Sequence, residues 1–357
     1  MAQLDAQFHP QHSGTGFELG WDHAHHGVTP SVDHLYGGSP LRQGWEAGKA
    51  KFGGRTMPSS AQVRQWLSLR THAWSRGRSF DGVQVTPNYL QQIDTDWCPI
   101  VRCALPRGAG SIDRVRHDAG YAAGNLVIMS NTANQAKGSH DFASASAVAQ
   151  SVAQGPFTVI GYLGAVEWQR VATLCSFVTE LPHEQAATLP LLLLPPNRLR
   201  LFNPIQALQA MVTRQLDTPN WSPRLARIQK LLPSHLAREF NSFVLALVAR
   251  VLEVGKLEQA QQIRWALEDA WADVRVQRHW SRLALQLSAE QAESIVQRAS
   301  QKRLATVLVQ QHAPDTATDG WAIERQGYAS AGLLRHQPTL GVLATRQGML
   351  NFESACA

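Results

Sequence analysis

The segment 111–138, SIDRVRHDAGYAAGNLVIMSNTANQAKG, is the part of this chain that most constrains its fold. An Asp-Arg pair comes first, a Gly-Tyr turn follows, and Asn125 opens the apolar run NLVIMS. The apolar run at 125–130 indicates a short strand after a turn that begins at Asp113, and the sequence after this strand predicts a helix over 132–137. Together with a short strand or knuckle expected at 98–103, residues 97–142 predict a small β-turn-β-α unit.

The order of these residues resembles the HNH nuclease family, in the variant that begins Ser-Ile-Asp-Arg, over residues 97–142 only. The resemblance implies a ββα fold, a nucleic-acid partner and one divalent metal ion, Mg²⁺ or Mn²⁺. In such an enzyme the metal stabilises the leaving oxygen of the phosphodiester. The resemblance assigns Asp113 and the helix-borne Asn134 to the metal, Asn125 to fixing the loop, and Lys137 to facing phosphate.

Arg114 departs from the family pattern, because it stands where the standard motif places the catalytic His. Arginine has a pKa above about 12 and cannot serve as a general base at neutral pH. His117 can supply the base if the loop folds it over the metal, or else it is an exposed turn residue. Asp113 also has an alternative, as a turn or salt-bridge residue. The candidate catalytic residues are Asp113, His117, Arg114 and Asn125.

Positive charge is concentrated in and just before this segment. The chain carries 33 Lys and Arg against 27 Asp and Glu, a net charge of +6, and residues 55–140 carry 10 basic and 5 acidic side chains. Nine of these ten are Arg, which is suited to bidentate phosphate contact, although a solvated surface with a mild basic excess explains the charge equally well. The expected phosphate contacts are Arg64, Arg70, Arg76, Arg78, Arg116 and Lys137.

Other residue types that often mark a functional site have simpler explanations here. Cys98 and Cys103 are spaced C-x4-C rather than C-x2-C, so we expect one or two small buried thiols and no structural zinc. A His-rich stretch near residues 22–34 has ligand types suited to metal but no regular spacing, which favours a loop without metal. Most of the eleven Trp occupy apolar helical positions, so core packing explains them better than stacking on nucleic acid.

The whole chain predicts an α+β fold that is mostly α-helical, with the ββα element followed by a larger all-helical domain. Within the helical domain, apolar periodicity predicts two long helices over 257–280 and 281–311. The expected parts are an irregular N-terminal arm with one short helix (1–58), a basic helix plus the ββα module (59–142), a linker or helix continuation (143–156), the helical domain (157–312) and a C-terminal extension that folds back on it (313–357).

Three functions agree with these features. The first is an HNH-like nucleic-acid-processing protein, a metal-dependent endonuclease acting on DNA. The others are a non-catalytic nucleic-acid-binding module and a helical protein-interaction factor with a degenerate ββα element. The opening residues lack the basic-then-apolar order of a signal peptide, and the most apolar run, 189–194, falls far short of the ~20 residues that span a bilayer. We therefore expect a cytoplasmic, bacterial-type protein without a membrane partner.

Overall fold

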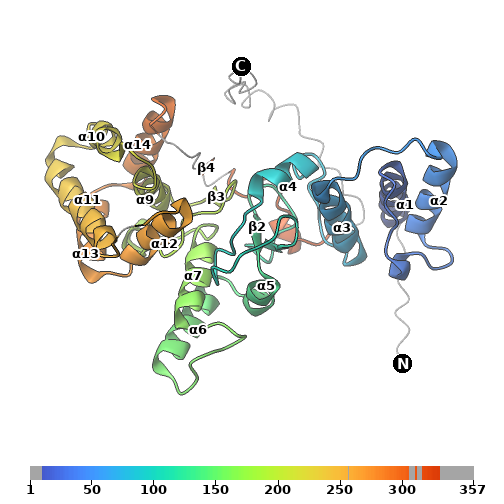
Figure 1. Ribbon diagram of the computed structural model, residues 1–357, viewed down its shortest axis with the longest axis horizontal. Helices are drawn as coiled ribbons and strands as arrows, with labels where there is room; N and C mark the ends of the chain where they lie inside the picture. The colour runs from blue at the N-terminus through green and yellow to red at the C-terminus, as the bar shows by residue number, and fades with distance from the viewer. Residues whose placement is uncertain (1–9, 256, 305–309, 312–315, 330–357) are drawn as a thin grey trace.

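The computed structural model describes residues 10–255, 257–304, 310–311 and 316–329. The chain is mostly helical, and Figure 1 shows the α1–α2 pair at one end, the ββα unit in the middle and the helices from α9 onward at the other end. The first half contains α1 (Pro10–His25), α2 (Pro40–Phe52), α3 (Ala61–Ser75), α4 (Pro87–Ile93), β1 (Ser111–Arg114), β2 (Leu126–Met129), α5 (Asn131–Lys137), α6 (Phe142–Gln154) and α7 (Ala165–Ser176). The second half contains α8 (His183–Thr188), β3 (Arg200–Leu201), α9 (Pro204–Gln215), α10 (Trp221–Gln229), α11 (Ala237–Leu252), α12 (Ala260–Ala270), α13 (Val274–Ala284), α14 (Ala289–Gln301) and β4 (Gln310–Gln311).

The N-terminal segment is not the irregular arm that its glycines predicted, because α1 and α2 are two closely packed helices. A Cβ atom on Gly20 of α1 would overlap the Leu41 carbonyl, and a Cβ atom on Gly44 of α2 would overlap the Phe17 carbonyl. The absent side chains thus allow the two backbones to touch. Glycines that suggested loops in the sequence are instead the packing surface of a helix pair.

Helix α3 holds this pair against the rest of the molecule. Its first turn is capped by Ser60, whose side chain accepts the Val63 amide, as the two serines predicted. Arg70 of α3 pairs with Asp22 of α1 at 2.6 Å, and a small core forms between the three helices from Leu19, Leu41 and Trp74.

The strand predicted at 125–130 and the helix predicted at 132–137 are confirmed as β2 and α5. Where a turn was expected from Asp113 onward, the chain forms strand β1, which pairs with β2 in antiparallel fashion, with Ser111 opposite Met129 and Arg114 opposite Leu126. Every residue of β2 is buried, and helix α5 follows directly, capped by the Ser130 side chain. We call β1, β2, their connecting loop and α5 the ββα unit. The stretch 98–103, expected to be a short strand or knuckle, is a turn flanked by a bridge between Trp97 and Ala104.

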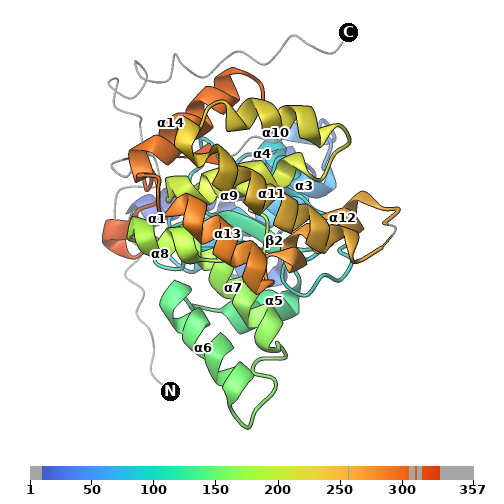
Figure 2. The same ribbon diagram turned by 90° about the vertical axis from the view of Figure 1, so that its left-hand side faces the viewer.

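Residues 143–156, expected to be a linker or a helix continuation, lie largely in the separate helix α6. Asp141 caps α6 through a reciprocal pair of hydrogen bonds with Ser144, and Ala145, Ala149 and Val152 form the buried face of α6. Helix α6 packs along α7, and the two project from the body of the molecule (Figure 2).

The region after α6 is helical, as predicted, but its helices are shorter than the periodicity suggested. The expected helix over 257–280 breaks at Asp273, which caps α13, and the next expected helix begins only at Ser288, which caps α14. A capping side chain accepts backbone N–H groups and so starts a new helix in a new direction. Within the described residues, we find no helix long and apolar enough to cross a bilayer.

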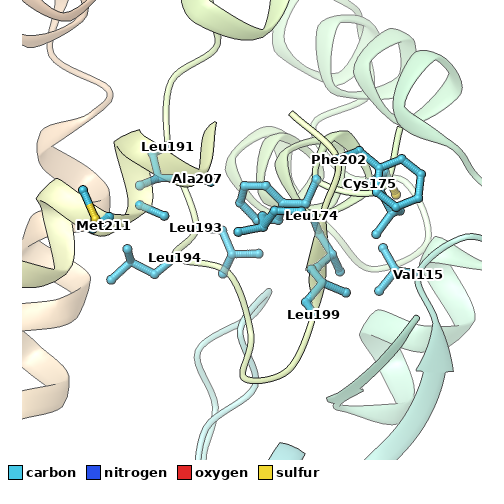
Figure 3. Close-up of a cluster of buried hydrophobic side chains, with 14 of the residues drawn as sticks. Val115, Leu174, Cys175, Leu191, Leu193, Leu194, Leu199, Phe202, Ala207 and Met211 are labelled. Carbon is cyan, nitrogen blue, oxygen red and sulfur yellow. The ribbon is translucent and has the colours of Figure 1, made fainter. Parts of the chain in front are cut away.

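One hydrophobic core connects the ββα unit to the helical region. Val115, in the β1–β2 loop, belongs to the same buried cluster as Leu174 and Cys175 of α7 and Phe202 beyond β3 (Figure 3). Trp321 completes it, with no exposed surface and an indole N–H that donates to the Ala123 carbonyl at 3.1 Å. Residues 316–329 therefore pack on the ββα unit as well as on the helical region, while the β-like TLGVLAT stretch lies outside the described residues.

The contact between α1 and α2 predicts opposite effects at two glycines. Gly44→Ala lowers the free energy of unfolding by about 1–3 kcal/mol, because a methyl group must displace the Phe17 carbonyl. Gly14→Ala is the matched control on α1, where nothing lies within 4 Å of the new Cβ, and it is neutral or stabilises by up to about 1 kcal/mol. Amide hydrogen exchange in α1 and α2 measures the stability of the helix pair in each variant. Equal protection in Gly44→Ala and Gly14→Ala contradicts the close backbone contact between α1 and α2.

Candidate functional site

A buried ion pair lies at the centre of the ββα unit. Asp113 of β1 faces Lys137, the last residue of α5, with 2.8 Å between Oδ2 and Nζ, and their side chains are 11% and 0% exposed. At this distance the two opposite charges attract each other strongly. Burial alone would lower the pKa of Lys137, but Asp113, with a smaller contribution from Cys175, outweighs burial, so the pKa is raised. Lys137 is therefore a charged ammonium, and its Nζ also donates to the Arg114 carbonyl at 3.1 Å.

This pair does not fit the metal site that the resemblance implies. A divalent ion on Asp113 would meet the Lys137 ammonium, and Asn134 donates from Nδ2 to the Ser111 hydroxyl at 2.6 Å. Within the described residues, no group of three or more His, Cys, Asp and Glu is placed to hold a metal ion. The prediction that Lys137 faces phosphate is wrong, because its side chain has no exposed surface.

Arg114 is folded into the loop between β1 and β2. Its Nη1 donates to the carbonyls of His117 and Ala119 at 3.0 and 2.7 Å, and its guanidinium lies over the Tyr121 ring, 5.0 Å from the centroid. Only 9% of the residue is exposed, and burial lowers its pKa. Arg114 thus shapes the loop rather than presenting its charge to phosphate.

Asn125 holds the same loop from the other side, in agreement with the loop-fixing role that the resemblance assigns to it. It is fully buried; its Oδ1 accepts the Arg116 amide at 2.8 Å, and its Nδ2 donates to the carbonyls of Arg116 and Gly120, each at 3.1 Å. All of its hydrogen bonds go to backbone, so its role is structural. Together with Arg114 it fixes residues 115–121 in one conformation.

Two histidines at this loop are partly exposed: His117 lies within the loop, and His72 of α3 packs against it. Burial lowers the pKa of His117, and the charges of Arg114, Arg78 and Lys137 lower it further. Burial also lowers the pKa of His72 of α3, with added effects of Arg76 and Arg114. Both imidazoles are therefore neutral at neutral pH. His72 was not predicted, although it lies one helical turn before Arg76 and packs edge-on against Tyr121, 6.3 Å between centroids.

The end of α3 and the β1–β2 loop together form what we call the basic surface: His72, Arg76, Arg78 and His117. Arg76 is exposed at the end of α3. Arg78 lies over the Tyr328 ring at 3.9 Å and donates to the Gln326 carbonyl at 2.7 Å. These contacts fix the position of its guanidinium beside the loop.

The six predicted phosphate contacts do not all gather there. Arg116 pairs with Asp118 at 3.0 Å and lines a hollow with Glu180 and Phe202. Arg64 is exposed at the opposite end of α3, where it donates to the Ser59 carbonyl. Arg70 is engaged with Asp22, and Lys137 is buried. Of the predicted set, only Arg76 and Arg78 therefore belong to the basic surface.

Comparison of the chain with known protein families, with curated proteins and with solved structures gave no match. The resemblance to HNH nucleases therefore rests on the residues of the 97–142 segment alone.

The Asp113–Lys137 pair predicts a large cost when one partner is removed. Lys137→Met lowers the free energy of unfolding by about 3–5 kcal/mol, because it leaves the Asp113 carboxylate buried without a counter-charge. Adding Asp113→Asn recovers part of this loss, as no net charge then remains. Lys302→Met, at an exposed lysine, changes stability by no more than about 0.5 kcal/mol. Denaturant unfolding compares the parent protein, the two single site variants, the double variant and the control, and strictly additive effects of the two site substitutions contradict the pairing.

Proposed function

We propose that this protein binds the phosphates of nucleic acid through the basic surface, without a metal ion on Asp113. The observation that supports this most directly is the lowered pKa of His72 and His117, which lie on separate elements. Arginines of the basic surface contribute to both shifts, after burial. Such convergence of positive charge attracts anions.

The carboxylates near this surface are already engaged. Asp113 pairs with Lys137, and Asp118 pairs with Arg116. Asp81 accepts the backbone amides of Val83 and Gln84. The positive charge of Arg76 and Arg78 is thus poorly balanced within the fold. A polyanion balances it and gains affinity by releasing counterions, which makes nucleic acid a fitting partner.

A second candidate is hydrolysis of the phosphodiester at the same surface, and the state of His117 favours it. Its lowered pKa keeps the imidazole neutral, which is the state that a general base requires. In this reaction His117 accepts a proton from water while the water oxygen bonds to phosphorus, the ester P–O bond breaks, and the leaving oxygen takes up a proton from solvent. Asp113 and Lys137 have no direct part in this step.

The binding proposal predicts a specific salt dependence. With EDTA present, fluorescence anisotropy of a labelled DNA duplex gives the slope of log affinity against log salt. Arg76→Ala/Arg78→Ala reduces this slope by about two, one for each lost phosphate contact. Arg278→Ala removes an exposed arginine of α13 and serves as the control that leaves the slope unchanged. If the double variant has the same slope and affinity as the parent protein, the basic surface is not the phosphate-binding site.

The same samples distinguish binding from hydrolysis when plasmid DNA replaces the duplex. Nicking that persists in EDTA and is lost in His117→Ala supports the second candidate. Plasmid that stays intact with and without Mg²⁺ supports binding alone. Nicking that requires Mg²⁺ and is lost in Asp113→Ala contradicts both.

The lowered pKa values of His72 and His117 predict that the affinity for nucleic acid rises as the pH falls. In the free protein both pKa values lie below 6.5, and a bound phosphate favours the imidazolium, so binding takes up protons. Affinity therefore rises as the pH falls from 6.5 toward about 5. The buried His23, with a pKa of about 4, stays neutral over this range, so α1 is not disturbed. Anisotropy at constant ionic strength measures the effect, and an equally steep pH dependence in His72→Ala/His117→Ala contradicts it.

A further inference from the structure

The turn at 98–103 brings two cysteines together. The Cys98 amide donates to the Cys103 carbonyl at 2.8 Å, the Arg102 amide donates to the Cys98 carbonyl at 2.9 Å, and Trp97 bridges Ala104 in antiparallel fashion. This backbone pairing places the two cysteines opposite each other across the turn. Cys98 is fully buried and Cys103 is exposed, so of the one or two buried thiols expected here the structure has one.

We propose that Cys98 and Cys103 form a dithiol–disulfide site that a small-molecule disulfide oxidises. The exposed Cys103 thiolate attacks one sulfur of that disulfide, and a mixed disulfide forms while the first small thiolate leaves and takes up a proton. The Cys98 thiol then loses its proton, its sulfur bonds to Cys103 Sγ, and the second small thiol leaves. Overall, two protein thiols and one disulfide give one protein disulfide and two small thiols.

The geometry favours the second step over an accumulating mixed disulfide. The backbone pairing across the turn keeps the two cysteines opposite each other, so the attack of Cys98 is intramolecular and benefits from a high effective concentration. Burial, together with Cys98, raises the pKa of Cys103, so less thiolate is present at neutral pH and the reaction quickens as the pH rises.

This dithiol lies between two contacts that position the ββα unit. Cys98 Sγ accepts the Ser130 amide at 3.3 Å, and its thiol donates to the Ser130 hydroxyl at 3.5 Å; Ser130 is the N-cap of α5. Arg102, beside Cys103, binds Asp269 at 2.7 and 2.8 Å through both carboxylate oxygens. A disulfide has no S–H group, so oxidation removes the bond to the Ser130 hydroxyl. Faster amide exchange in the first turn of α5 is the expected result.

The test uses the full chain carrying Cys356→Ser, since Cys356 lies outside the described residues. The protein is incubated with glutathione disulfide, alkylated, and mapped by mass spectrometry. We expect a Cys98–Cys103 disulfide that lacks two hydrogen atoms, with Cys175 still reduced. Cys175 is a good internal reference because its burial raises its pKa to about 11.

Two variants test which cysteine reacts first with the small disulfide and which one resolves the mixed disulfide. Cys98→Ser should accumulate glutathione on Cys103, because no second thiol resolves the mixed disulfide. Cys103→Ser alters an exposed residue and should leave Cys98 reduced, because the buried thiol cannot reach the oxidant. Glutathione that accumulates on Cys103 while Cys98 is still present and alkylated overturns the proposal, as does oxidation of Cys98 in Cys103→Ser.

Discussion

Lys137 carries a positive charge with no exposed surface, and this constraint determines the arrangement around it. A buried ion costs several kcal/mol unless a counter-charge and hydrogen bonds compensate it. Asp113 supplies the charge and the Arg114 carbonyl supplies a hydrogen bond, so β1 and the end of α5 must stay together. The acid that the resemblance gives to a metal ion is therefore used inside the protein. We infer that the ββα unit keeps its shape through this pair and offers a different surface to its partner.

The surface it offers depends on the rigidity of the β1–β2 loop. Arg114 and Asn125 bind the loop carbonyls from within, and the carbonyl of Trp321 accepts the Gly120 amide at 2.7 Å from the C-terminal side. His117 is thus held next to the end of α3, where Arg76 and Arg78 add their charge. Positive groups fixed in place by the fold lose little entropy on binding phosphate, which is the physical basis of the proposed function.

Much of the fold could be predicted from local patterns. Strand β2 and helix α5 followed from the apolar run before Asn131 and the residues after it, and the expected basic helix is α3. Strand β1 was not predicted, because its residues indicated the start of a turn. The α1–α2 pair could not be predicted, because glycine at a backbone contact and glycine in a loop have the same local signal. The Asp113–Lys137 pair was also hidden, since it joins residues 24 positions apart whose burial only the tertiary structure determines. The loop-fixing role of Asn125 was accessible because it acts within nine residues of its own chain.

Titration with Mn²⁺, followed by electron paramagnetic resonance of the free ion, tests whether the ion pair with Lys137 leaves Asp113 available to a metal. The parent protein and Asp113→Asn are compared at equal concentration and low salt. Because Lys137 already neutralises Asp113, the account predicts that both proteins leave the same amount of Mn²⁺ free. One Mn²⁺ bound by each parent molecule and lost in Asp113→Asn would contradict the account and restore the metal site.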